Sequence, residues 1–86
     1  MTLDELRAEI DAVDDELAAL LARRMALAAQ VAAVKRGTGA PVLQPGREEA
    51  ILARLGAGMD PQYLPALTAV YQAIFRASRE LQEGLI

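Results

Sequence analysis

The 86-residue sequence predicts an all-α fold with three helices, at about residues 3–36, 45–56 and 61–84. Residues 3–36 contain no Gly and no Pro and include ten Ala residues. Apolar side chains recur in all three segments at helical spacing, and the segments between them are rich in Gly and Pro. No stretch shows the alternation of a β-strand, so we expect one helical domain over residues 1–86.

The first predicted helix has an apolar stripe that one arginine interrupts. At alternating steps of three and four residues, the stripe reads Leu3, Leu6, Ile10, Val13, Leu17, Leu20, Arg24, Leu27, Val31 and Val34. Thr2 and Glu5 form a capping-box pair at the start of this helix, and Gly37 is the residue expected to end it. A cation in an apolar seam is costly unless an anion meets it. Arg24 is therefore the first candidate functional residue.

The length of the first helix predicts an oligomer. At about 1.5 Å per residue, residues 3–36 form a rod of roughly 50 Å, whereas a compact globule of this size is only about 30 Å across. The rest of the chain cannot cover a stripe of that length. We therefore expect an intertwined homodimer in which a second copy covers the overhang. The alternative is a helix that kinks and folds back, but this segment has no Gly or Pro to break it.

The other two helices have recognisable ends. Pro45 suits the first turn of the second helix, which is expected to stop at Gly56. Asp60 and Pro61 fit the N-cap and first position of the third helix. Pro65 indicates that the first turn of this helix is irregular or that the regular helix begins only there.

The composition excludes several kinds of chemistry. The chain has no Cys and no His, and 9 basic against 12 acidic residues give a net charge of −3. Disulfides, zinc sites, thiol nucleophiles and Ser-His triads are thereby excluded, and we expect neither a metal nor a cofactor. The negative charge disfavours a nucleic-acid groove or a polybasic membrane surface. No uninterrupted apolar run reaches the ~20 residues of a membrane span, and no signal peptide is recognisable. We expect a cytoplasmic protein without nucleic-acid or membrane partners.

Each predicted helix has polar residues on or beside its apolar face. They are Arg7, Arg24 and Lys35 on the first helix, Arg47 and Glu48 on the second, and Ser78 and Gln82 on the third. Each has a plain structural interpretation when taken alone, such as an ion pair for Arg24, a bond back to its own helix for Ser78, or an exposed position for Gln82. The interpretation as solvated flanking residues applies to Arg7, Arg23, Arg36, Arg54, Arg76 and Arg79.

Taken together, these residues predict an anion pocket. Several cations, one carboxylate and one amide would face a shared interior, and Arg side chains suit bidentate binding of carboxylates. The ligand should be small and carry at least two carboxylates. Without a nucleophile or a metal, the chemistry should need only a held conformation and stabilisation of developing charge.

The same residues resemble the all-helical class of chorismate mutases. The resemblance rests on Arg7, the segment 20–24, Lys35, the Pro-x-Arg-Glu element at 45–48 and Ser78-x-x-x-Gln82, which occur in the family's order. It implies an intertwined three-helix dimer whose two sites are each built from both chains. It also implies the conversion of chorismate to prephenate by a [3,3] rearrangement of the enolpyruvyl ether, on the path to Phe and Tyr.

The resemblance assigns the main binding and catalytic roles. Arg7 would reach into the partner's site and, with Arg24, hold the substrate carboxylates. Lys35 and Gln82 would donate hydrogen bonds to the ether oxygen, where negative charge grows as the C–O bond breaks.

Four further positions complete the implied site. Arg47 would lie beside the substrate, Glu48 would accept a hydrogen bond from the ring hydroxyl, and Ser78 would lie near the ring carboxylate. Gln44 stands where the family frequently has Asp, and it is kept as a site residue because its contact can run through the main chain.

Three alternatives remain open. An isochorismate pyruvate lyase would use the same cationic cage, although the intact Pro-x-Arg-Glu element with Glu48 favours the mutase. A non-catalytic helical dimer could serve as a regulatory or docking module, with Arg24 and Lys35 either relics of a lost activity or members of structural ion pairs. Finally, segment 73–79 resembles the mutase part of bifunctional proteins, so the chain is either free-standing or associated, covalently or not, with another aromatic-pathway enzyme.

Overall fold

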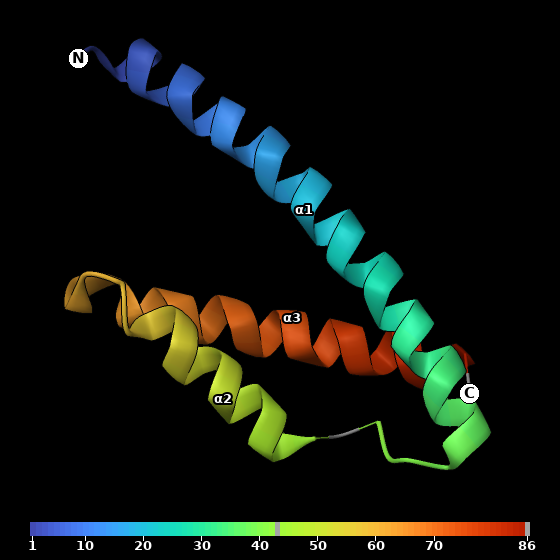
Figure 1. The fold of residues 1–86 in the computed structure, drawn as a ribbon. Helices are drawn as coiled ribbons and strands as arrows, with labels where there is room; N and C mark the ends of the chain where they lie inside the picture. The colour runs from blue at the N-terminus through green and yellow to red at the C-terminus, as the bar shows by residue number, and fades with distance from the viewer. Residues whose placement is uncertain (43, 86) are drawn as a thin grey trace.

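The computed structural model describes residues 1–42 and 44–85, and these residues are almost entirely helical (Figure 1). Helix α1 spans Leu3–Thr38 and α2 spans Pro45–Gly56. A short 3₁₀ turn, η1 (Pro61–Tyr63), leads into α3 (Leu64–Leu85). Within the described residues there is no strand, and the predicted all-α class is confirmed.

The start of α1 is as predicted, but its end is not. The Glu5 backbone N–H donates to Thr2 Oγ1 at 3.1 Å, and the Glu5 carboxylate accepts from the Thr2 N–H at 3.4 Å. The prediction that Gly37 ends the helix is wrong, because the helix continues to Thr38. Gly39 has the left-handed conformation that ends the helix, with φ 72°, and its N–H donates to Lys35 O at 2.8 Å.

The ends of α2 and α3 agree with the sequence. Pro45 occupies the first turn of α2. Asp60 caps η1 by accepting a hydrogen bond from the Gln62 N–H at 3.0 Å. The irregular first turn that Pro65 indicates is the 3₁₀ turn η1, which precedes regular helix from Leu64 onward.

The packed part of the molecule is small. The C-terminal half of α1 crosses α3, and α2 packs against the N-terminal half of α3 (Figure 1). The buried apolar residues are Ala28, Ala32, Ile51 and Phe75. The chain measures 53 × 25 × 16 Å with a radius of gyration of 15.8 Å, against about 12 Å for a compact domain of this length.

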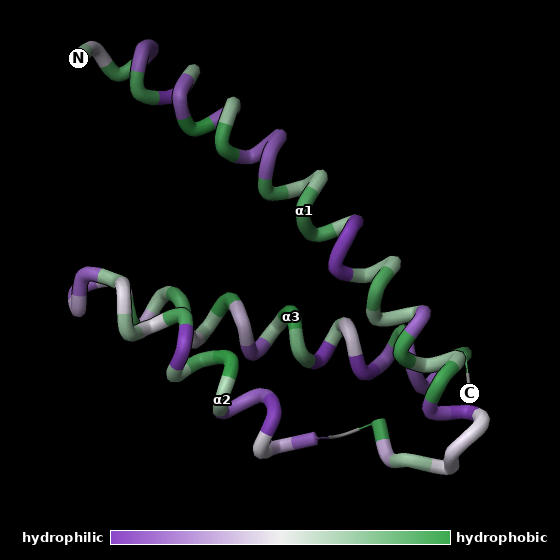
Figure 2. The backbone as a smooth tube through the Cα atoms, in the orientation of Figure 1, coloured by the Kyte–Doolittle hydropathy of each residue, from purple (hydrophilic) through white to green (hydrophobic). Residues whose placement is uncertain are grey.

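The first half of α1, residues 3–20, projects beyond the other helices, and we call it the arm (Figure 1). Hydrophobic and hydrophilic residues alternate along it, as the colouring of the backbone by hydropathy shows (Figure 2). Its apolar side chains are largely exposed. Six of them are between 43% and 60% exposed: Leu3, Leu6, Ile10, Val13, Leu17 and Leu20. Contiguous exposed apolar patches on a protein often mark interaction sites.

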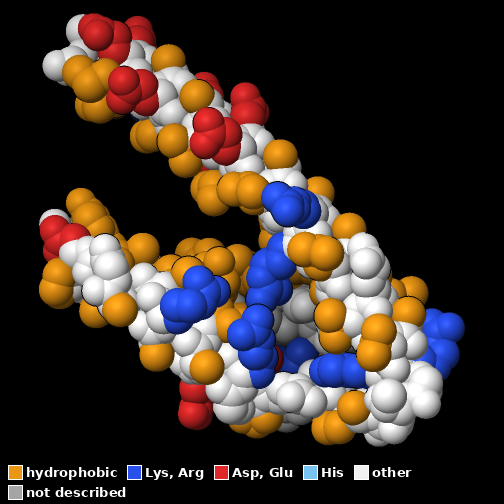
Figure 3. Space-filling model, in the orientation of Figure 1, with side chains coloured by type: hydrophobic (Ala, Val, Ile, Leu, Met, Phe, Trp, Pro, Cys, Tyr) orange, Lys and Arg blue, Asp and Glu red, His pale blue; other side chains and the backbone are white. Residues whose placement is uncertain are grey.

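Charge is divided between the arm and the rest of the chain. Residues 1–16 contain seven acidic residues and one arginine, whereas residues 17–86 contain five acidic and eight basic residues. Figure 3 shows the acidic groups along the arm and the basic groups around a hollow at the other end of the molecule. The net charge of the chain is therefore negative, although the part outside the arm, residues 21–86, is positively charged. We call this part the body.

Among the described residues, α1 is the one helix long and apolar enough to cross a membrane, with mean hydropathy 1.5 over 18 residues. That window runs from Leu17 to Val34 and contains Arg23 and Arg24. Each arginine near the centre of a spanning helix costs about 2.5–3.5 kcal/mol on insertion scales. A helix whose apolar face packs against other helices passes the same test, and the C-terminal half of α1 packs against α3.

Candidate active site

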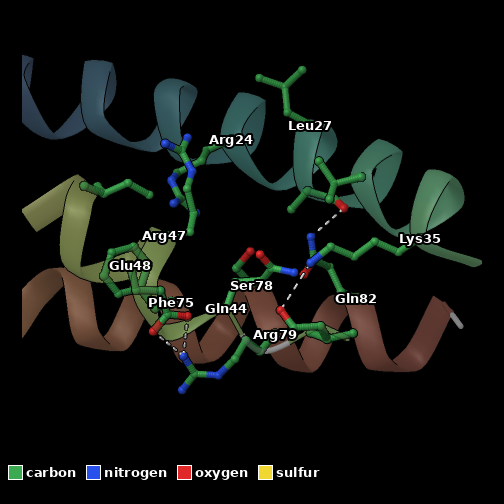
Figure 4. A pocket seen from close by; sticks show the side chains of 14 residues that line it. Arg24, Leu27, Lys35, Gln44, Arg47, Glu48, Phe75, Ser78, Arg79 and Gln82 are labelled. Atoms are coloured by element: carbon green, nitrogen blue, oxygen red, sulfur yellow. Dashed lines mark hydrogen bonds and ion pairs between the residues drawn. The ribbon is translucent and has the colours of Figure 1, made fainter. Parts of the chain in front are cut away.

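A pocket of about 490 Å³ lies between the C-terminal halves of α1 and α3 and the start of α2 (Figure 4). Seven of the eight predicted site residues line it: Arg24, Lys35, Gln44, Arg47, Glu48, Ser78 and Gln82. Its apolar walls include Leu27, Val31, Ile51 and Phe75. The volume suits a small organic ligand.

Arg24, which interrupts the apolar stripe, lies against aromatic rings. Its guanidinium carbon is 6.0 Å from the centre of the Tyr71 ring and 5.7 Å from that of Phe75. These two rings, one helical turn apart on α3, meet edge to face at 5.6 Å. Such contacts orient a guanidinium group without neutralising it. In the described part of the chain no carboxylate lies within ion-pair distance of Arg24.

Lys35 is held by the segment that follows α1. Its Nζ donates to Pro41 O at 3.0 Å and to Val42 O at 3.3 Å. The Gln44 amide donates to the same Pro41 oxygen at 3.4 Å. Because an ammonium group has three N–H bonds, Lys35 has one donor left after both contacts.

Gln82 is buried, with 7% of its surface exposed. Its Nε2 donates to Ala28 O on α1 at 3.0 Å. A carbonyl acceptor at this distance decides which end of the amide is the nitrogen, and one N–H of that nitrogen remains available. The interpretation of Gln82 as an exposed residue near a helix end is therefore wrong. In Figure 4 the nitrogen atoms of Gln82 and Lys35 lie at the same end of the pocket.

Arg47 and Ser78 complete the lining on α2 and α3. Figure 4 shows Arg47 and Arg24 pointing toward one another at the end of the pocket away from Lys35. Arg24, Arg47 and Lys35 are thus three cations around one cavity, and none has a carboxylate partner among the residues that the structure describes. Over the same residues, no cluster of carboxylates is placed to hold a metal ion.

Glu48 has a partner that the sequence analysis missed. Arg79 Nη1 donates to both carboxylate oxygens of Glu48, at 2.7 and 2.6 Å. Arg79 also lines the pocket, so its interpretation as a solvated flank is wrong. The missed signal was a charge requirement: Glu48 was the one carboxylate predicted in the site, and a partly buried carboxylate needs a cation. Arg79 follows Phe75 by one helical turn.

Arg7 is the one predicted site residue that this chain does not bring to its pocket. It is exposed on the arm, seventeen residues before Arg24, which is about 25 Å along a helix. No contact within a single straight helix can join the two residues.

The fold and the site together define a class of protein: a short all-α chain whose three helices surround a cationic pocket of the size of a small polyanion. The sequence profile of the family described as chorismate mutase type II matches residues 6–83. The chain therefore belongs to the chorismate mutase type II family.

Individual relatives agree with this assignment. The crystal structure of chorismate mutase from Helicobacter pylori in complex with prephenate matches with a TM-score of 0.86 and 39% identity, over 96% of this chain and 91% of that chain. Chorismate mutase from Methanocaldococcus jannaschii is 40% identical over 53 residues, which are 62% of this chain and 54% of that protein. The T-protein of Haemophilus influenzae is 48% identical over 50 residues, 58% of this chain but only 13% of the T-protein. The matches thus span only part of these two curated relatives.

Proposed function

We propose that this chain is a chorismate mutase, an isomerase that converts chorismate to prephenate in the biosynthesis of Phe and Tyr. One observation carries the proposal: three cations, Arg24, Arg47 and Lys35, surround a pocket of about 490 Å³ and have no carboxylate partner among the residues that the structure describes. Such a pocket is preorganised for a ligand with more than one carboxylate, and chorismate is a dicarboxylate. Membership of the chorismate mutase type II family supports the same reaction.

The reaction needs a held conformation. In the [3,3] rearrangement the ether C–O bond breaks while a C–C bond forms within the same molecule, so no group enters or leaves. Arg24 and Arg47 at one end of the pocket would fix the carboxylates and fold the ether over the ring. Holding the reacting atoms in such a near-attack geometry can remove on the order of 7–11 kcal/mol of the barrier.

Lys35 and Gln82 would stabilise the charge that develops on the ether oxygen. Each has one N–H left over after its contacts with backbone carbonyls, and these contacts fix both donors before substrate arrives. Donors that need no reorganisation are the most effective at a growing negative charge. Because that charge is larger in the transition state than in the substrate, the contact lowers the barrier rather than only the Michaelis constant.

The remaining pocket residues would set the orientation of the ring. Glu48 would accept a hydrogen bond from the ring hydroxyl, Ser78 would lie near the ring carboxylate, and Gln44 would bind at the loop side of the pocket.

A second copy of the chain would complete the site with Arg7. The exposed apolar stripe of the arm supports this arrangement. A second hollow on the body offers further surface for a partner helix. The described residues that line it are all apolar: Leu21, Met25, Val70, Ala73, Ile74 and Ala77. In the intertwined homodimer that we propose, the arm of each chain covers the other body and delivers Arg7 to its pocket.

The decisive experiment measures chorismate consumption by the purified protein and identifies the product. We expect prephenate from the wild type and about a hundredfold lower kcat/KM for Arg24→Ala, on the scale of losing one charge-stabilising contact. Arg23→Ala is the matched control, because Arg23 is exposed and does not line the pocket, and it should retain activity. If the protein is a folded dimer and chorismate is not consumed, the proposed mutase activity is refuted.

The same assay addresses the alternatives. Release of pyruvate from isochorismate would indicate the lyase, and an inert protein that still binds ligand would indicate a regulatory module. A cytoplasmic location and an association with another aromatic-pathway enzyme remain predictions.

A further inference from the structure

The pocket brings a carboxylate close to the cations that would bind a substrate. It contains one carboxylate, Glu48, together with cations that have no partner in the described chain. Opposite charges lining one small cavity attract each other strongly when water is partly excluded. A Glu48 side chain that swung toward Arg24 or Arg47 would occupy the groups that must bind the substrate carboxylates.

Arg79 holds Glu48 away from that position. Both carboxylate oxygens of Glu48 accept hydrogen bonds from the single Nη1 atom of Arg79, at 2.7 and 2.6 Å. The Glu48 side chain is 23% exposed and the Arg79 side chain 28%. Figure 4 shows Arg79 on the side of Glu48 opposite to Arg24 and Arg47. The ion pair therefore pulls the carboxylate away from the substrate-binding cations.

The pair leaves Glu48 able to bind. A carboxylate offers about four acceptor positions, and the two bonds to Arg79 use only two. The contact also restrains a long side chain whose rotamers would otherwise have to be ordered when the ligand binds.

We propose that Arg79 is a positioning residue: it orients Glu48 as an acceptor for the ring hydroxyl and prevents Glu48 from neutralising the cations that bind the substrate carboxylates. This inference rests on the proposed function, because the hydroxyl and the carboxylates belong to chorismate or prephenate.

The test is a double-mutant cycle of wild type, Arg79→Gln, Glu48→Gln and the double variant. We expect Arg79→Gln to raise KM for chorismate about tenfold or more, with a lower kcat, because a freed charged group competes with the substrate. In the double variant the freed side chain is uncharged, so its KM should return to that of Glu48→Gln. Such non-additivity, in which Glu48→Gln cancels the effect of Arg79→Gln on KM, is expected for a residue that acts through its neighbour.

A purely structural role of the α2–α3 ion pair predicts a different result. Arg79→Gln would then lower the melting temperature and the active fraction without changing KM, and the second substitution would not restore anything. Either finding overturns the inference. Arg76→Gln is the matched control, because Arg76 is exposed on the same helix outside the pocket.

Calorimetric titration with prephenate separates this inference from the mutase activity. We expect about tenfold weaker binding by Arg79→Gln and recovery in the double variant, whether or not the wild type turns over chorismate. If Arg79→Gln and the wild type bind prephenate equally tightly, the proposed role of Arg79 is overturned, but the proposed mutase activity is not. A wild-type protein that binds no prephenate overturns both proposals.

Discussion

Single residues in this pocket are held largely by backbone carbonyl oxygens. Lys35 is fixed by the carbonyls of Pro41 and Val42, and Gln82 by that of Ala28. A carbonyl restrains a donor without removing a cation's charge. The donors are therefore fixed in position and still available to a ligand.

Most of the residues that line the pocket could be predicted from the sequence, because polar residues on or beside an apolar helix face violate the apolar pattern. Arg24 and Gln82 stand where carbon should be buried, and such violations are visible without a structure. Arg79 shows no such violation, since it belongs to a helix flank and acquires its role only through Glu48, 31 residues away. The aromatic contacts of Arg24 could not be predicted either, because they depend on how α1 crosses α3.

The buried amide of Gln82 predicts a pH-independent donor. We expect kcat of the wild type to show no loss attributable to this group between pH 5 and pH 8. Gln82→Glu would place a carboxylate against the Ala28 carbonyl, where it can donate only when protonated. Its kcat should fall as pH rises, to about a hundredfold below wild type at pH 8. Parallel pH–rate profiles of the two proteins would contradict this role.

Asp60 predicts a loss of stability in acid. Hydrogen bonds from the Gln62 backbone N–H, and then from the Gln62 side chain, lower the pKa of Asp60 below its ordinary value of 3.8. A lowered pKa in the folded state means that the carboxylate stabilises the fold above the unfolded pKa, and that this contribution disappears as pH falls through the folded pKa. The difference in unfolding free energy between wild type and Asp60→Asn should therefore narrow from pH 5 to pH 2. Urea unfolding measures it, and a constant difference would contradict the cap.

At the scale of elements, the long α1 and the limits of α2 followed from the sequence, but the end of α1 did not. Gly37 and Gly39 both suit a helix end by residue type. Only the backbone distinguishes them, because Gly39 alone has a positive φ. The two-residue extension carries the chain to the point where the Pro41 and Val42 carbonyls reach Lys35.

Substitution of the two glycines by alanine should change the stability of the fold in opposite directions. Gly39→Ala should destabilise the fold by about 1–2 kcal/mol, because a left-handed conformation is strained for Ala. It should also lower kcat, since Gly39 positions the segment that holds Lys35. Gly37→Ala is the matched control, and should stabilise α1 by about 0.5–1 kcal/mol, because it lies within the helix and a Cβ there meets nothing within 4 Å. Chemical denaturation of both variants tests the assignment, and equal effects would refute it.

At the scale of the whole molecule, the shape of one chain supports a shared site. The pocket of a chain and its own Arg7 are too far apart to meet along one helix. The sequence predicted this overhang from helix length alone. It could not predict where a partner would lie, because that depends on surfaces formed only after α1, α2 and α3 have packed.

A shared site predicts that two inactive chains restore each other. In a mixed dimer of Arg7→Ala and Arg24→Ala chains, one site combines an intact arm with an intact body. Random mixing should give about one quarter of wild-type activity, because about half of the dimers are mixed and each has one intact site of two. A mixture of Arg24→Ala with Arg47→Ala is the control, since every site then carries a defect. No recovery in the first mixture, or equal recovery in both, would contradict the exchange of arms.

The separation of charge along α1 affects how a ligand finds the pocket. A net charge of −3 would by itself repel a dianion during diffusion. The approaching ion instead meets a body in which basic residues outnumber acidic ones, and the field of a cleft lined mainly by cations attracts it. The ligand is therefore attracted to the pocket, and this electrostatic attraction weakens as ionic strength rises. The rate of capture is therefore governed by the charges around the pocket rather than by the net charge of the chain.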